Sequence, residues 1–421
     1  MREMRDSGVA WIGEIPEEWS LIRFKDKYKN SKEIAGEKSI EYQRLALTLN
    51  GVVQRPKNDS DGLQPKEFDT YQVLHENDFV FKMIDLQNIS TSRVGLSPYT
   101  GLVSPAYIRF RPKNNTQYPR FIYYFLMGMY YNCVFNNLGG DGVRSALNAS
   151  DIGTLLIPYP DGKIQKQIGE SLDTICANVD TLTTNIKTQI EKLKAYKQSL
   201  IIEVVTKGLD PTVPMKDSGV EWIGEIPAHW KIQRGKALFK ETDARSADGS
   251  EELLTVSQYT GITPRSQKNV TMFEALSLEG YKICEIGDIA ANTMWLWAGA
   301  IGISEYRGVV SPSYNVYRQR SNNFAPRYLD HLLRAPMLVQ EYASLSTGIR
   351  ASRLRLYPKD FFNIMFPVPP LEEQQAILDA LNSKLSAVDR LIAIKQAKIE
   401  KLEQYKRSLI YEYVTGKREV I

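Results

Sequence analysis

Asp6–Trp19 reads DSGVAWIGEIPEEW, and Asp217–Trp230 reads DSGVEWIGEIPAHW. The two stretches are identical at 11 of 14 positions and lie 211 residues apart, half of a 421-residue chain. A second repeat follows, because Ile190–Thr206 (IEKLKAYKQSLIIEVVT) matches Ile399–Thr415 (IEKLEQYKRSLIYEYVT) at 12 of 17 positions. The chain is therefore one module written twice. Such a duplication provides two similar surfaces related by a pseudo-two-fold axis.

Each copy ends in a stretch with the pattern of a long helix. From Leu378 to Tyr413, apolar residues recur at spacings of three and four, and the same stripe runs from Leu172 to Val204, 209 residues earlier. A stripe kept over about five heptads predicts a coiled coil, and each helix of about 40–45 residues is the natural partner of the other. Five residues interrupt the stripes: Gly169, Thr183, Lys197, Lys395 and Lys406.

The segments before the helices predict globular domains of the α+β class. Residues 20–157 mix short β-rich runs with Gly, Asn, Asp and Pro, and one apolar stretch, Arg120–Tyr131, has helical length. Residues 231–366 repeat this pattern more loosely. We therefore predict two α/β domains joined by two long antiparallel helices that form a coiled coil. The predicted divisions are residues 1–157, 158–208, 209–366 and 367–421.

The position of the first repeat predicts where the chain ends lie. Asp217–Trp230 follows the first long helix, whereas Asp6–Trp19 has no helix before it in the sequence. A pseudo-two-fold arrangement requires Asp6–Trp19 to lie beside the end of the second helix, near Gly416–Ile421. We therefore expect the termini to be close together and the fold to be effectively circular. Gly208 and Gly416 mark the expected helix ends.

The composition is that of an ordinary globular protein, with 43% hydrophobic and 24% charged residues. The net charge of +4 permits nucleic-acid binding without requiring it. The sequence contains no run of apolar residues long enough to span a membrane, and its polar N-terminus is unlike a signal peptide. We expect a soluble, cytoplasmic protein with reduced cysteines, since these are isolated from one another: Cys133, Cys176 and Cys284.

The sequence lacks the motifs of the common catalytic chemistries. It has no G-x-x-x-x-G-K-[ST] loop for ATP, no G-x-G-x-x-G after a predicted strand, and no Asn-Pro-Pro-Tyr or Asp-Pro-Pro-Tyr run of amino-methyltransferases. The histidines, His75, His229 and His331, lie in separate segments, so we expect neither a catalytic triad nor a metal site. The chain is therefore interpreted as a binding protein without catalytic residues.

Two motifs carry a resemblance to a known family. Phe366–Ile377 (FPVPPLEEQQAI) resembles the strand end, Pro-Pro turn and helix start of the specificity subunits of Type I restriction–modification systems. The DSGVxWIGEIPxxW segment is similar to the stretch that opens each half of many members. The first copy departs from the pattern, because Pro158–Ile168 (PYPDGKIQKQI) lacks the Pro-Pro-x-Glu-x-Gln form.

The resemblance implies a non-catalytic subunit of an adenine DNA methyltransferase and ATP-dependent endonuclease complex in a prokaryote. Each globular domain would be a target-recognition domain that reads one half of a bipartite, asymmetric site on double-stranded DNA. The helices would act as spacer and as docking surface for two methyltransferase (modification) subunits. S-adenosylmethionine would belong to those subunits, and ATP and Mg to the restriction subunits, so no cofactor is expected in this chain.

Side chains that suit DNA contact gather in three predicted loops of each domain. Arg, Lys, Asn and Gln hydrogen-bond to base edges, and Lys, Arg, Ser and Thr contact phosphates. The alternative for each is an ordinary solvated surface residue. The candidates in the first domain are Gln54, Arg55, Lys57, Lys82, Gln87, Asn88, Thr91, Arg93, Arg144 and Ser145. Those in the second are Gln258, Tyr259, Thr263, Arg265, Lys268, Asn292, Trp295, Trp297, Arg350, Ser352, Arg353 and Arg355.

Two pairs of candidates allow a more specific prediction. Arg144 and Arg350 occupy matched positions in otherwise different domains, so we expect them to contact phosphate, a task that both domains share. Trp295 and Trp297, two apart in a predicted strand, would share one face and be either buried together or exposed together. The main alternative function is a coiled-coil adaptor that binds proteins, which would lack salt-dependent, sequence-specific DNA binding.

Overall fold

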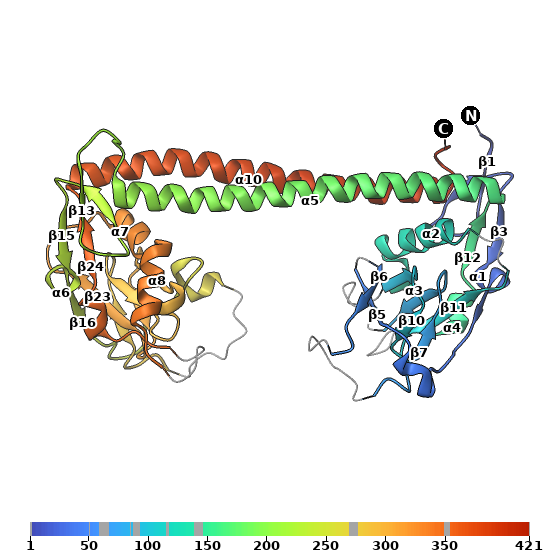
Figure 1. Ribbon diagram of the computed structural model, residues 1–421, viewed down its shortest axis with the longest axis horizontal. Coiled ribbons are helices and arrows are strands. Elements are labelled where there is room, and N and C mark those ends of the chain that lie inside the picture. The colour runs from blue at the N-terminus through green and yellow to red at the C-terminus, as the bar shows by residue number, and fades with distance from the viewer. Residues whose placement is uncertain are drawn as a thin grey trace. The chain divides into compact units, whose positions relative to one another are not determined.

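The computed structural model describes residues 2–49, 51–58, 67–84, 86, 93–114, 118–138, 146–268, 277–348 and 354–420. The chain divides into two compact units (Figure 1). Unit 1 consists of Met1–Ile186 and Gln396–Ile421, and unit 2 of Lys187–Lys395. Each unit thus combines one globular domain with a part of each long helix.

The globular domain of unit 1 consists of short strands and helices. Two of its sheets have four strands each, in the orders β6-β5-β10-β7 and β4-β11-β8-β9. The predicted helix is present as α2, with Pro119 in its first turn, where proline is favoured. The elements are β1 (Met4–Asp6), β2 (Glu14–Pro16), β3 (Ser20–Arg23), α1 (Phe24–Lys27), β4 (Tyr28–Asn30), η1 (Gly36–Ile40), β5 (Arg44–Thr48), β6 (Gly51–Arg55), β7 (Gln72–Leu74), β8 (Phe79–Lys82), β9 (Arg93–Leu96), β10 (Gly101–Val103), β11 (Ile108–Pro112), α2 (Pro119–Tyr131), α3 (Val134–Leu138), α4 (Ala149–Gly153) and β12 (Leu156–Tyr159).

The globular domain of unit 2 repeats this architecture. Its four-stranded sheet has the order β16-β23-β20-β21, the counterpart of β4-β11-β8-β9 in unit 1, so the α+β class and the duplication are confirmed. The elements are β13 (Met215–Asp217), β14 (Glu225–Pro227), β15 (Lys231–Arg234), α6 (Gly235–Leu238), β16 (Phe239–Thr242), β17 (Leu254–Ser257), β18 (Gly261–Pro264), η2 (Arg265–Gln267), β19 (Lys282–Cys284), β20 (Ile289–Ala291), η3 (Leu296–Ala298), β21 (Ile301–Ile303), β22 (Gly308–Val310), β23 (Asn315–Gln319), α7 (Pro326–Leu333), α8 (Pro336–Leu345), α9 (Pro358–Phe361) and β24 (Met365–Val368).

The two predicted long helices are present as α5 (Gly162–Lys207, 46 residues) and α10 (Leu371–Val414, 44 residues). Burial of the apolar stripe holds them together, as expected for a coiled coil. The buried members of the stripe are Leu172, Cys176, Val179, Ile186, Ile190, Leu200 and Val204 on α5, and Leu378, Leu381, Leu385, Val388, Ile399, Leu409 and Tyr413 on α10.

The lysines that interrupt the stripe contact polar side chains of the opposite helix. In unit 1, Lys406 Nζ lies 2.7 Å from Asp180 Oδ1, and in unit 2, Lys197 Nζ lies 2.7 Å from Asp389 Oδ1. In unit 2, Lys197 contacts Asp389 and Gln189 contacts Lys395, so residue numbers rise along α5 as they fall along α10 and the pairing is antiparallel. The third interrupting lysine, Lys395, donates to Gln189 Oε1 at 2.5 Å.

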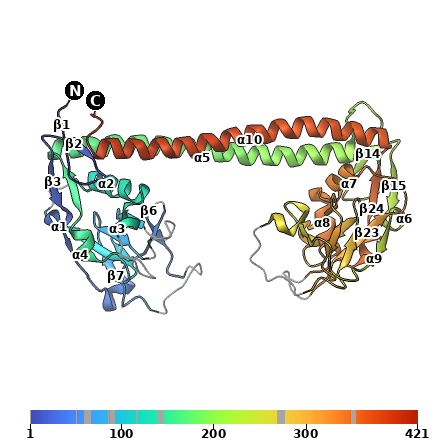
Figure 2. The same cartoon turned by 180° about the vertical axis from the view of Figure 1, so that it is seen from behind.

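Both ends of the chain belong to unit 1, which confirms the prediction of close termini (Figure 1, Figure 2). Tyr411 Oη and Lys417 Nζ both donate to the carbonyl oxygen of Ile12, at 3.0 and 2.9 Å. Gly416, with φ +72°, packs against the rings of Pro16 and Trp19. A side chain at Gly416 would collide with the proline ring, so the end of the second helix lies directly beside the first repeat segment.

The two repeat segments differ in the hydrogen bonding of their buried tryptophans. Trp230 and Trp19 are each 1% exposed. Trp230 Nε1 donates to Glu373 Oε2 at 3.0 Å, and His229 Nε2 lies 2.8 Å from the same oxygen. Unit 1 has Ile164 at the position of Glu373, and Trp19 Nε1 has no hydrogen-bond partner among the described residues. The departure noted at this turn of the first copy thus removes one hydrogen bond.

Replacing Glu373 tests this difference between the units. We expect Glu373→Leu to lower the free energy of unfolding of unit 2 by about 1–3 kcal/mol, because it leaves the buried indole N–H of Trp230 unsatisfied. Ile164→Glu is the matched change in unit 1. It should slow hydrogen exchange in the segment around Trp19, because the new carboxylate can accept from the indole N–H. Hydrogen exchange read by mass spectrometry on peptides from the two repeat segments measures both effects. Equal changes in both segments would contradict this account.

Candidate nucleic-acid interface

A buried carboxylate precedes the corresponding strands β8 and β20 in the two domains. Asp78 and Asp288 are each 1% exposed. Arg109 Nε donates to Asp78 Oδ2 at 2.6 Å, and Arg318 donates to both oxygens of Asp288 at 2.6 and 2.7 Å. Arg109 is fully buried, whereas the Arg318 side chain is 44% exposed. In both pairs the carboxylate is buried, so loss of its arginine would leave an uncompensated buried charge, which is strongly unfavourable. These pairs therefore hold β8 and β20, and with them the connections to β9 and β21 that contain several candidate residues.

Cationic side chains lie directly opposite each other in unit 1. Lys82 on β8 pairs with Arg93 on β9, and Arg44 on β5 pairs with Arg55 on β6. Like charges at directly opposed positions of antiparallel strands destabilise the pairing. A polyanion that neutralises them would relieve this repulsion, so the arrangement favours nucleic-acid binding.

The positive charges of two of these arginines act on the phenol of Tyr107. Burial raises the pKa of its phenol, whereas the charges of Arg93 and Arg44 act to lower that pKa. The Nη1 atom of Arg44 is buried and has no hydrogen-bond partner in the described part of the chain. The sequence analysis missed Arg44, although the Asn50–Gly51 pair signals a hairpin that brings it opposite Arg55.

The other candidates of unit 1 have different environments. Gln54 is exposed on β6, while Arg55 is partly buried. Lys57 Nζ donates to the carbonyl oxygens of Ser39 and Ile40 at 2.8 and 3.1 Å, so its ammonium group braces η1. DNA contact by any of them stays a prediction. Five candidates lie outside the described residues: Gln87, Asn88, Thr91, Arg144 and Ser145.

In unit 2, candidates surround the hairpin of β17 and β18. The side chain of Tyr259 is 81% exposed at its turn. Arg334 fixes this turn, because its Nη2 donates to the carbonyl oxygens of Gln258 and Tyr259 at 3.3 and 2.8 Å. Thr263 on β18 and Arg265 in η2 are partly buried.

Lys268 lies close to the same turn. Its Nζ donates to Thr260 Oγ1 at 2.8 Å, and partial burial lowers its pKa. The structure therefore brings Lys268 and the exposed ring of Tyr259 to one end of this hairpin.

The connection between β20 and β21 contains both candidate tryptophans. Trp295 is the N-cap residue of the 3-10 helix η3 and Trp297 lies within it, so the expectation of a strand was wrong at this point. The local reason is a turn closed by Asn292, whose buried side chain accepts from Met294 N and donates to Tyr314 Oη. The two indoles nevertheless lie together, with ring centroids 5.8 Å apart, and Trp295 is 50% exposed. Trp297 is partly buried, so the pair is neither fully buried nor fully exposed.

The last predicted loop of unit 2 is described only at its end. Arg355 is exposed, and its backbone pairs with that of Thr347 in an isolated bridge. Arg350, Ser352 and Arg353 lie outside the described residues. The proposed phosphate contact of Arg350, like that of Arg144, therefore stays a prediction.

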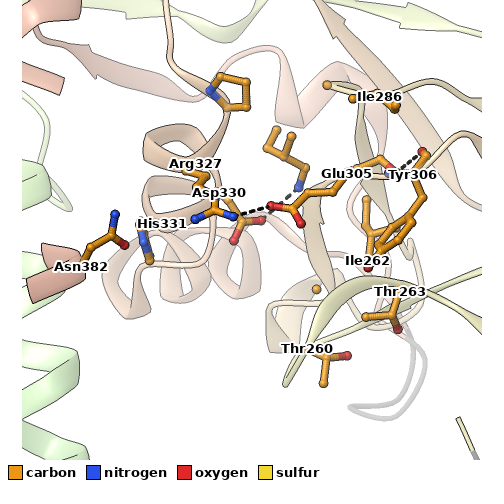
Figure 3. A pocket seen from close by; sticks show the side chains of 15 residues that line it. Thr260, Ile262, Thr263, Ile286, Glu305, Tyr306, Arg327, Asp330, His331 and Asn382 are labelled. Carbon is orange, nitrogen blue, oxygen red and sulfur yellow. Dashed lines mark hydrogen bonds and ion pairs between the residues drawn. The ribbon is translucent and has the colours of Figure 1, made fainter. Parts of the chain in front are cut away.

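A pocket of about 540 Å³ lies in unit 2 beside the β17–β18 hairpin (Figure 3). Thr260 and Thr263 line it on the hairpin side, and α7 and α10 contribute Asp330, His331 and Asn382. Asp330 Oδ1 accepts from the backbone N–H of Ile303 at 3.0 Å, and burial lowers the pKa of His331. The pocket lies where the β-strands of this domain meet the helices. Of the residues that line it, Thr263 is a candidate from the sequence.

Among the residues that the structure describes, no group of three or more His, Cys, Asp or Glu side chains is placed to hold a metal ion. None of the described helices has the length and apolar character needed to cross a membrane.

Comparison with known proteins finds one family in two copies. The sequence profile of the type I restriction modification DNA specificity domain matches residues 20–192 and 231–404. Two relatives come from Methanocaldococcus jannaschii. The MjaX protein, assigned as a type I restriction enzyme specificity subunit, is 25% identical over 97% of this chain and 96% of its own length. The type I restriction enzyme MjaVIII specificity subunit is 24% identical, over 96% and 94%.

Two solved structures share the fold. One, described as the structural basis underlying complex assembly and conformational transition of the type I R-M system, has a TM-score of 0.67 and 14% identity, over 96% of this chain and 99% of its own. The other is the HsdS subunit from Thermoanaerobacter tengcongensis, with a TM-score of 0.51 and 14% identity, over 96% and 98%.

The cross-strand cations of unit 1 predict opposite effects on stability and binding. Lys82→Gln should leave stability unchanged or slightly raised, because it removes repulsion from Arg93, and should weaken binding to all duplexes. The slope of log affinity against log salt should fall by about one unit. Thermal unfolding and fluorescence anisotropy measure the two effects. Lys163→Gln, at an exposed position on α5, is the control. Loss of stability with an unchanged salt slope would show a structural role instead.

Proposed function

The chain belongs to the type I restriction–modification DNA specificity family, and we propose that it reads a bipartite, asymmetric sequence on double-stranded DNA. Each globular domain would read one half of that site. One observation carries the proposal: the family's domain occurs twice, and the two copies place different side chains at the same point of the fold.

That point is the connection between β8 and β9 in unit 1 and between β20 and β21 in unit 2. In unit 1 it starts at Lys82 and ends at Arg93, whereas in unit 2 it contains Trp295 and Trp297. Charged side chains suit phosphates and guanine, while apolar ones suit the methyl group of thymine. Equivalent connections with different chemistry support two different half-sites.

We further propose that the helices bind two methyltransferase (modification) subunits. Large apolar side chains are half-exposed at positions that repeat at 209 residues. Leu182 and Tyr405 lie in unit 1 and are 50% and 53% exposed, and Tyr196 and Leu391 lie in unit 2 and are 53% and 47% exposed. Exposed apolar side chains on a helix suit docking of an amphipathic partner helix. One such pair in each unit supports one modification subunit per unit.

In this proposal, catalysis takes place in the partner subunits. S-adenosylmethionine belongs to the modification subunits, and ATP and Mg to restriction subunits that join the full complex. The sequence supports this division, because it carries no ATP-binding loop and no methyltransferase motif. The present chain supplies DNA recognition and assembly.

Exchange of one domain tests whether each domain recognises its own half of the DNA site. Replacing residues 20–157 with those of a relative should change one half of the methylated sequence and leave the other half intact. Methylome sequencing of a host that carries either version, together with the modification subunit, measures the outcome. A host without the gene is the control. A change in both halves would contradict independent domains.

A second candidate function, a protein-binding adaptor, predicts a different result. Its globular domains would grip proteins, so the purified complex would show no preference for one duplex over competitor DNA. Weak, salt-dependent binding alone does not separate the two functions, because it is sequence-independent. The sequence that is methylated in the host separates the two functions.

Substitutions on the helices test the docking of modification subunits. Leu182→Ser with Tyr405→Ser should remove one modification subunit from the complex, because both changes fall in unit 1. Tyr196→Ser with Leu391→Ser, the matched pair in unit 2, should remove the other. Native mass spectrometry counts the subunits, and Lys163→Gln again serves as control. Retention of both subunits after all four changes would contradict this docking surface.

A further inference from the structure

The connection between β20 and β21 presents an apolar knob, defined here as Met294, Trp295 and Trp297. Met294 is 40% exposed and Trp295 is 50% exposed. The two indole rings stack with their planes 24° apart. Exposed tryptophan is unusual on a protein surface, and a cluster of this kind marks a binding site.

The fold holds the knob in one conformation. Leu296, between the two tryptophans, is fully buried, and Trp297 Nε1 donates to the carbonyl oxygen of Met294 at 2.9 Å. Gly299 has φ +87°, which closes the turn and favours glycine. The rings are therefore positioned before any partner binds, and little conformational entropy is lost on binding.

We propose that this knob enters the major groove of DNA and contacts thymine methyl groups in the half-site of unit 2. The inference rests on the proposed function and adds to it the kind of base that one domain recognises. The methyl group of thymine is the apolar group among the base edges of that groove. Contact between the knob and this methyl group is favourable, because it removes apolar surface of both the rings and the methyl group from water.

The size of the stacked rings decides between the grooves. Their centroids are 5.8 Å apart, so with van der Waals half-thicknesses the pair spans about 9 Å. The major groove of B-DNA is about 12 Å wide and the minor groove about 6 Å. The pair therefore fits within the major groove, and along the line that joins the two rings it is wider than the undistorted minor groove.

Hydroxyl groups beside the knob suit the DNA backbone. Thr293 Oγ1 donates to the carbonyl oxygen of Ser313 at 2.7 Å, which joins the start of the knob to the segment before β23. Ser311 and Ser313 place their Oγ atoms 2.9 Å apart in that segment. Serine and threonine hydroxyls commonly bind phosphate oxygens, so this segment can contact the strand while the rings face base edges.

Deoxyuridine substitution tests the contact, because it removes only the methyl group. The duplex carries the sequence identified by methylome sequencing, and the domain exchange identifies the half read by unit 2. Replacing each thymine of that half in turn should weaken binding of the wild-type complex about fourfold at a contacted position, as burial of one methyl group predicts. In Trp295→Ala and Trp297→Ala, affinity should fall and the deoxyuridine penalty should disappear. Thymines in the other half serve as the control, since any penalty there should be the same in wild type and variants.

The outcomes separate failure of this inference from failure of the proposed function. Sequence-specific binding without a deoxyuridine penalty, or with the same penalty in wild type and variants, overturns the thymine contact and leaves the proposed function standing. Absence of sequence-specific binding by the wild-type complex overturns the proposed function. Normal DNA binding by the variants with loss of a modification subunit would show that the knob contacts protein. Trp295→Gln retains a longer side chain than alanine and tests the same points if Trp295→Ala fails to fold.

Discussion

The antiparallel register of α5 and α10 is the constraint on which both units depend. Burial of the apolar stripe sets it, and two ion pairs accompany it, Asp180 with Lys406 in unit 1 and Lys197 with Asp389 in unit 2. Asp180 corresponds to Asp389, and Lys197 to Lys406, at an offset of 209 residues. The same ion pair is therefore made twice, with the helices exchanging roles. A duplicated chain achieves this only when the helix of each half pairs with that of the other, so each unit requires both halves.

The two long helices could be predicted from the sequence, because an apolar stripe kept over about five heptads remains clear despite a few interrupting residues. The sequence also predicted the close termini, which follow from the repeat and symmetry alone. Strand pairing was less accessible, since a sheet such as β4-β11-β8-β9 joins segments that are distant in sequence. The expected strand around Trp295 was wrong because Asn292 closes a turn there, an interaction that alternation of residue types does not reveal.

Candidate residues were predicted from residue type, and the structure shows where residue type falls short. Lys57 has the chemistry of a phosphate contact but binds two carbonyl oxygens of its own fold. Arg44 was missed because only the pairing of β5 with β6 puts it opposite another arginine. The side-chain partners of a cation depend on tertiary structure. Cross-strand pairs of cations such as Lys82 and Arg93 are therefore stronger candidates than any single basic residue.

The two units separate residues that maintain the scaffold from residues that differ between halves. Asp78 with Arg111 recurs as Asp288 with Arg318, and in unit 1 the buried Arg109 is a second partner of Asp78. These contacts hold the strands that lead into the variable connections. The connections themselves are cationic at their ends in one unit and aromatic in the other. Replacing a connection leaves the buried ion pair and the helix register untouched, so its chemistry can change at little cost to folding. A fold of this kind can acquire a new half-site without altering the helices through which it would assemble with its partners.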